Sequence, residues 1–326
     1  MHPEIFEIPF IHATIKSYGL MLVIGFLVAL AIFKRLGKGI KVDPNIVTNA
    51  AIYALIAGII GARLFYVIHY FDSFKGRPLK MFAVWEGGLE QLGGVLFALI
   101  VICYYLFRYK LPARKYMDIL AVALMAALVF GRIGCFLNGC CYGKPTDAAW
   151  GVRFPYNSLA YQSQINIAPK RGRNEPYLEL PNDYICGYAQ KDGYREKILQ
   201  EFSELSPDQR QAVTTGPYRC LKVHPTQLYD SAMAGIWCLA LFAFWQTGRR
   251  HEKLGKNTIF SKSGTTFALM MILYSVTRFS MEFIRDDNPF EFAGLTVSQL
   301  ISIVMFILGI ALMAIFSRMK NKTSGH

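Results

Sequence analysis

Residues 131–143 read GRIGCFLNGCCYG, and they end a long apolar run that begins near Tyr116. Arg132 therefore lies inside a segment whose length and composition are typical of a helix that crosses a membrane. A charged side chain at that depth is costly in free energy, and it usually serves a function. The stretch thus predicts a membrane protein with a polar site, and the other segments indicate what surrounds this arginine.

Six further apolar runs accompany this one in a chain of 326 residues that is 53% hydrophobic. Each has about 20 residues, enough for a helix to cross a bilayer core of roughly 30 Å, and backbone groups in lipid must pair within a helix. We therefore predict an all-α polytopic membrane protein and no soluble fold. Its seven transmembrane helices are expected at residues 17–35, 48–70, 92–109, 116–137, 226–246, 264–284 and 296–316.

The basic residues of the chain indicate its orientation. The formal net charge is +13, and lysine and arginine concentrate after the first, third and fifth spans and in the C-terminal tail. This positive-inside pattern predicts an N-terminus outside the membrane and a cytoplasmic C-terminus. The orientation of the spans thus explains the positive charge, and no nucleic-acid partner is expected. No basic cluster precedes the first span, so we expect it to be retained rather than cleaved as a signal peptide.

The segments between the spans differ in polarity and predict the layout of the chain. We expect an outer interfacial segment, four membrane helices with an interfacial arm, a periplasmic head, three membrane helices and a cytoplasmic tail. The head is inserted between the fourth and fifth helices. The bounds are 1–16, 17–142 with the arm at 71–86, 143–223, 224–316 and 317–326.

Two other arginines are predicted at the depth of Arg132. Arg63, Arg132 and Arg278 each lie about 14 to 16 residues into an outward span, which corresponds to roughly 21–24 Å from the cytoplasmic edge. Tyr274, Arg278 and Glu282 are four residues apart and share one helix face. Glu282 can orient Arg278 and leave donors free for a phosphate, which arginine binds through two parallel hydrogen bonds. The pattern predicts an arginine clamp for a lipid phosphate in the outer leaflet.

Structural roles are the alternative for these polar residues. A single intramembrane arginine can be a buried ion pair or reach toward water, and that alternative stays open for Arg63. For Arg132 and Arg278 together we favour function, because the spans hold too few carboxylates to pair all the arginines. Tyr18 and His224 lie at outer ends of spans, where an interfacial or capping role competes with a role in the site.

The cysteines predict packing rather than metal binding. Cys135, Cys140 and Cys141 have a spacing that fits no zinc motif, so we expect no metal and no other cofactor. Cys186 and Cys220 share the outer head, where a disulfide between them is plausible because such compartments are oxidising.

In these motifs the chain resembles the prolipoprotein diacylglyceryl transferases. The strongest similarity lies in the Gly131–Thr146 stretch. The other similar segments are Tyr18-Gly19-Leu20, Gly61-Ala62-Arg63, His224-Pro225-Thr226-Gln227-Leu228-Tyr229, and Tyr274 with Arg278, Glu282 and Arg285. They occur in the family's order across nearly the whole chain, and residues 155–221 are the least similar part.

The resemblance implies an enzyme of the bacterial inner membrane. The family moves the diacylglyceryl group of phosphatidylglycerol onto the lipobox cysteine of a prolipoprotein signal peptide, and it releases glycerol phosphate. Membrane lipids are therefore expected partners, and this is the first step of lipoprotein maturation. The expected catalytic groups are Arg132, Arg278, His224 and Glu282. The expected substrate-binding groups are Arg132, Arg278, Arg63, Tyr18, Asn138, Gly143 and Tyr274.

Three positions depart from the family pattern. Leu92 stands where the family often has histidine, and Cys135 and Cys140 stand where it often has asparagine and glutamate. A base at the histidine position therefore cannot operate here. The remaining candidates for thiol activation are His224, Glu282, Glu90 or no dedicated base.

A lipid or anion transporter with an arginine-lined path is the alternative function. Such proteins place their sites near the bilayer midplane between inverted repeats. This sequence has no evident repeat, and its arginines are predicted off-centre, so we favour the transferase.

Overall fold

Long helices dominate the computed structural model, which describes residues 4–8, 13–38, 43–74, 76, 78–84, 88, 90–191, 194–290 and 292–319. A long helix occupies each expected span. They are α1 (Ser17–Gly37), α2 (Pro44–His69), α3 (Gln91–Arg108), α4 (Ala113–Asn138), α7 (Thr226–Lys253), α8 (Thr265–Met281) and α9 (Val297–Arg318). Within the described ranges, α1, α2, α4, α7 and α9 are long and apolar enough to cross a membrane. The helix α3 is apolar but shorter, and α8 has 17 residues. The chain is a polytopic helical membrane protein.

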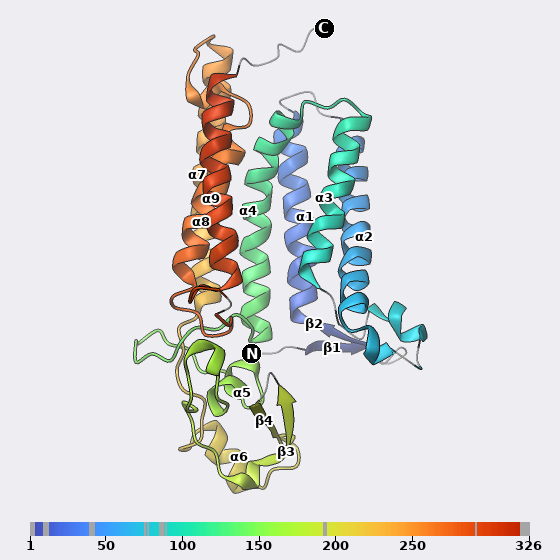
Figure 1. Cartoon of the computed structure of the whole chain (residues 1–326). Helices are drawn as coiled ribbons and strands as arrows, with labels where there is room; N and C mark the ends of the chain where they lie inside the picture. Colours follow the sequence, from blue (N-terminus) through green and yellow to red (C-terminus); the bar gives the residue numbers. More distant parts are fainter. Residues whose placement is uncertain are drawn as a thin grey trace.

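Helix α4 is central to the bundle. It packs against α1 on one side and against α7 and α8 on the other, while α2 pairs with α3 and α8 with α9 (Figure 1). Asp118, buried near the start of α4, accepts hydrogen bonds from the backbone N–H groups of Gly264 at 2.6 Å and Phe267 at 3.0 Å. One intramembrane carboxylate thus serves as a structural cap for the first turn of α8.

Short elements gather at one end of the bundle (Figure 1). Between α4 and α7 lie α5 (Leu159–Ile165), β3 (Ile185–Lys191), β4 (Tyr194–Leu199) and α6 (Pro207–Thr214). They surround a hydrophobic core of their own that includes the fully buried Tyr161 and Ile165. The 3-10 helices of the predicted arm, Phe71–Phe74 and Pro78–Phe82, lie at the same end.

The expectation of an all-α chain is wrong in detail. Strands β3 and β4 form an antiparallel hairpin, and β1 (Glu4–Ile8) pairs with β2 (Ala13–Lys16) in a second one. Both hairpins lie outside the long helices, where water or headgroups can hydrogen-bond the edges of a small sheet. Hydropathy identifies the spans but carries little information about such short strands.

The disulfide between Cys186 and Cys220 is absent. Both thiols are free. Cys186 is exposed on β3, whereas Cys220 is buried in the core of the 143–223 segment. Burial raises the pKa of the Cys220 thiol to about 11. The two cysteines share a segment of the chain but not an environment.

The two thiols should differ in reactivity. At pH 8 only about one in a thousand thiols of pKa 11 is ionised, and the thiolate is the reactive form. We expect iodoacetamide to modify Cys186 rapidly and Cys220 only after denaturation, as read by peptide mass spectrometry. Equal labelling of both, or a linked peptide pair under non-reducing conditions, would contradict this structure.

Candidate active site

Three segments that are far apart in the sequence meet just beyond the end of α4. The N–H of Gly143 donates to the carbonyl of His224 at 3.1 Å, and the N–H of His224 donates to Lys144 at 3.1 Å. The N–H of Lys144 donates to Ile284 at 2.8 Å, and Gly143 forms an isolated bridge with Arg285. Backbone pairing thus joins the 131–143 stretch, the start of α7 and the end of α8 at one place.

Gly143 occupies a position with no room for a side chain. A Cβ there would lie 2.7 Å from both Cβ and the carbonyl oxygen of His224, and 2.9 Å from Cγ2 of Thr226. Its described neighbours are protein atoms, so the close approach of two backbones explains the glycine. The substrate-binding role expected for Gly143 stays a prediction.

Substitution of Gly143 should therefore destabilise the junction. We expect Gly143→Ala to lower the free energy of unfolding by about 1–3 kcal/mol, because overpacking against backbone cannot relax. Thermal unfolding in detergent measures the effect. Gly187→Ala on β3, where a Cβ would meet nothing within 4 Å, is the matched control. Equal melting temperatures for the two variants would be incompatible with the described contact.

Arg132 is paired with a carboxylate that no sequence motif indicated. Its Nε lies 3.4 Å from Oδ2 of Asp230 on α7, and both side chains are largely buried, with 12% and 7% exposed. Asp230 is the only acidic residue of the predicted fifth span, which is the signal that could have found it. A buried charge requires such a partner.

Arg278 has the partner that helical spacing predicts. Its Nη1 lies 2.7 Å from Oε2 of Glu282, and its Nη2 donates to Oγ of Ser298 at 2.6 Å. The second oxygen of Glu282 accepts from Nδ2 of Asn288 at 2.7 Å. Both oxygens of Glu282 are thus engaged, which favours an orienting role over that of a base. The predicted contact of Arg278 with Glu282 is confirmed. The expectation that too few carboxylates remain to pair Arg132 as well is wrong, because Asp230 pairs with it.

A further arginine cluster lies beside this pair. Arg285 donates to both carboxylate oxygens of Asp287, at 2.9 and 2.6 Å. From the 143–223 segment, Arg171 donates to the carbonyl of Arg285 at 2.7 Å, and Nη1 of Arg173 lies 3.4 Å from Oδ2 of Asp286. Burial raises the pKa of Asp286, an effect that Arg173 and Arg171 oppose. No pattern in the sequence marked Arg171 or Arg173.

Arg63 contacts a different part of the chain. Its Nε donates to the backbone carbonyl of Met81, its Nη1 to that of Gly88 and its Nη2 to that of Lys80. These bonds hold Lys80, Met81 and Gly88 against α2, so the described contacts support a bracing role. A place for Arg63 in the phosphate clamp stays a prediction.

Tyr18 and Tyr274 lie close to the central stretch. Cδ2 of Tyr18 is 3.2 Å from the point that a Cβ would occupy at Gly134, so its ring covers the turn of α4 that follows Arg132. Tyr274 is partly buried one turn before Arg278 and lies near Arg132. Asn138 is the last residue of α4.

His224 belongs to a small aromatic network. Its Nδ1 lies 3.3 Å from Oη of Tyr229, which accepts from Nε1 of Trp150 at 2.7 Å. Oε1 of the other candidate base, Glu90, lies 3.4 Å from Nδ1 of His69. The side chain of Leu92 lies outside the described residues. His224 is thus at the junction through its backbone, while its ring faces Tyr229.

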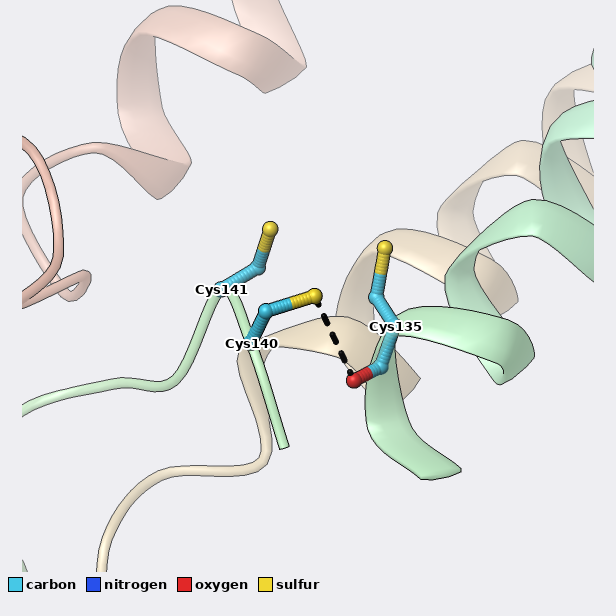
Figure 2. Close-up of side chains that lie close together, drawn as sticks. All are labelled: Cys135, Cys140 and Cys141. Carbon is cyan, nitrogen blue, oxygen red and sulfur yellow. Dashed lines mark hydrogen bonds between the residues drawn. The ribbon is translucent and has the colours of Figure 1, made fainter. Parts of the chain in front are cut away.

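One group of side chains among the described residues could hold a metal ion. The thiol sulfurs of Cys135, Cys140 and Cys141 all lie within 4.8 Å of one another (Figure 2). Their spacing along the chain did not indicate this, because a turn after α4 brings them together.

Comparisons with known proteins agree on one family. A model of the prolipoprotein diacylglyceryl transferase family matches residues 3–315. A phosphatidylglycerol–prolipoprotein diacylglyceryl transferase of Xanthomonas campestris pv. campestris (strain B100) is 30% identical over 310 residues, which cover 92% of this chain and 87% of the relative. The enzyme of the same name from Xanthomonas oryzae pv. oryzae (strain PXO99A) is 29% identical with the same coverage. This chain belongs to the prolipoprotein diacylglyceryl transferase family.

Proposed function

We propose that this protein transfers the diacylglyceryl group of phosphatidylglycerol to the lipobox cysteine of prolipoproteins. Family membership supports the reaction, and the family match displaces the transporter alternative. The observation that best supports the site is the group of arginines around Asp230. The carboxylate of Asp230 interacts electrostatically with Arg132, Arg278 and Arg285. Fixed cations at one place are what a lipid phosphate requires.

The charges of the cluster support the binding of an anionic phosphate. Five arginines, Lys144 and four carboxylates meet at the junction, so positive charge is in excess. The arginines are Arg132, Arg171, Arg173, Arg278 and Arg285. The carboxylates are Asp230, Glu282, Asp286 and Asp287. The phosphodiester of phosphatidylglycerol carries one negative charge and would offset part of that excess.

The chemistry follows from this arrangement. The substrate thiol loses its proton, and its sulfur attacks the glycerol carbon that bears the phosphate ester. A carbon–sulfur bond forms while the carbon–oxygen bond breaks, and the bonding pair leaves with glycerol phosphate. Negative charge therefore grows on the leaving phosphate, where preorganised donors in a site of low dielectric stabilise it most. Arg132 and Arg278 are the proposed donors, and Asp230 and Glu282 hold them in place.

The same proposal includes the membrane arrangement. All seven long helices cross the inner membrane, the N-terminus is outside, and residues 143–223 form a periplasmic head. The positive-inside pattern supports this orientation. So does the gathering of the arm and the 143–223 segment at one end of the bundle, because both of these polar parts then lie on the outer side.

One assay tests the proposed function. Purified protein is incubated with phosphatidylglycerol and a lipobox peptide, and mass spectrometry detects the thioether product. We expect a peptide with serine in place of the lipobox cysteine to stay unmodified. Failure of the cysteine peptide to gain a diacylglyceryl group, with folded protein and both substrates present, would contradict the proposal.

His224 is the proposed acceptor of the thiol proton. We expect His224→Gln to lower the transfer rate by about 10²-fold at neutral pH, the lower end of what a general base contributes. The loss should shrink as pH rises, because the thiol then ionises unaided. His251→Gln, the same substitution in the last turn of α7, is the matched control. A pH–rate profile of His224→Gln that parallels the wild type would exclude this role.

A further inference from the structure

The three clustered thiols are brought together by the way α4 ends. Gly139 has φ of 73° and reverses the chain, and the N–H of Cys140 donates to the carbonyl of Cys135 at 3.2 Å. Cys141 itself has φ of 60°, a left-handed conformation that is uncommon for residues other than glycine. The sulfurs of Cys140 and Cys141 consequently lie beside that of Cys135 on the last turn of the helix (Figure 2).

Two buried side chains of α7 hold this turn in place. Oγ1 of Thr226 donates to the carbonyl of Cys141 at 2.6 Å, and Nε2 of Gln227 donates to the carbonyl of Cys140 at 2.7 Å. Thr226 and Gln227 are completely buried. The backbone that carries two of the thiols is therefore positioned by a neighbouring helix rather than by the turn alone.

We propose that Cys135, Cys140 and Cys141 form a binding site for one thiophilic cation, and that its ligand count fits Cu(I). In this proposal the three thiols lose their protons to solvent and form three metal–sulfur bonds. Bonds of about 2.3 Å to one ion place three sulfurs about 4 Å apart in a plane. The observed separations of at most 4.8 Å need only small side-chain rotations to reach that geometry.

Ligand number and type distinguish Cu(I) from zinc. Structural zinc takes four ligands, usually with histidine or a fourth cysteine, whereas soft thiolates select Cu(I). No histidine or carboxylate among the described residues joins the three sulfurs. The charges also fit, because three thiolates with Cu(I) carry two negative charges. Arg285 and Arg132, although each is also paired with a carboxylate, interact electrostatically with Cys141 and favour negative charge there.

The proposal goes beyond transferase activity and is tested without it. Reduced, purified protein is titrated with Cu(I) under anaerobic conditions against a chromogenic Cu(I) chelator, with no lipid or peptide present. We expect one Cu(I) per chain, and at least tenfold weaker binding in each of Cys135→Ser, Cys140→Ser and Cys141→Ser. Cys103→Ser and Cys186→Ser, which remove exposed thiols elsewhere, should bind as the wild type does.

A second measurement uses the wild-type chain and does not depend on the folding of variants. Bound Cu(I) should protect these three cysteines, and not Cys103 or Cys186, from alkylation as mapped by mass spectrometry. Unchanged affinity in the three serine variants would overturn the proposal. So would equal alkylation with and without Cu(I), displacement of Cu(I) by equimolar zinc, or a disulfide within the cluster of freshly purified protein.

Discussion

Replacement of Arg132 or Arg278 by alanine is expected to lower the rate of diacylglyceryl transfer by about 10²–10³-fold, the loss typical when one preorganised donor is removed. Each guanidinium is largely buried and held by a carboxylate, so water cannot readily take its place. The effect should appear mainly in kcat, because charge on the phosphate is greatest in the transition state. Steady-state kinetics with phosphatidylglycerol and a lipobox peptide measures it.

Two further variants make this prediction specific. Arg278→Lys keeps the charge but loses the planar pair of donors, so we expect an intermediate loss. Arg108→Ala, at the exposed C-terminal end of α3, should leave the rate unchanged. Wild-type rates for both folded variants, Arg132→Ala and Arg278→Ala, would remove the clamp from the mechanism.

Removal of the carboxylate at Asp230 should produce the largest loss of stability. Asp230→Ala leaves Arg132 buried without its partner, and breaking a buried ion pair from one side costs about 3–5 kcal/mol. We expect a lower melting temperature in detergent and a transfer rate reduced along with it, because Asp230 positions Arg132. Asp147→Ala, which removes an exposed carboxylate from the segment after α4, should change neither.

A double-mutant cycle separates pairing from other effects. If Asp230 acts through Arg132, the variant that lacks both side chains should unfold no earlier than Asp230→Ala alone, since no uncompensated charge remains. Additive losses from the two substitutions would show that the residues act independently and would contradict the described pair.

The sequence predicted the parts of the molecule that depend on local periodicity. Apolar runs of span length located each long helix, because a backbone in lipid has few alternatives to a helix. The spacing of four between Arg278 and Glu282 predicted their contact, because such residues are neighbours on any helix surface. The sequence motifs also indicated the family.

Contacts between distant segments could not be predicted from local sequence patterns. Asp230 lies on a different helix from Arg132, and Arg171 reaches the end of α8 from another part of the chain. The predicted disulfide between Cys186 and Cys220 is wrong, because two thiols in one segment of the chain need not be neighbours in space. The proximity of Cys135, Cys140 and Cys141 was not predicted, because spacing does not reveal the left-handed turn that folds them onto each other.

By itself the sequence determined that this is a helical membrane protein, and it determined the family through its motifs. The tertiary structure alone decided which charges are neutralised, that Arg63 holds Lys80, Met81 and Gly88 against α2, and that three thiols converge beside Arg132. The physical reason is that hydropathy and helical period act along the chain. Ion pairs, backbone bridges and clusters of ligands depend on distances through space, which only the packing of helices sets.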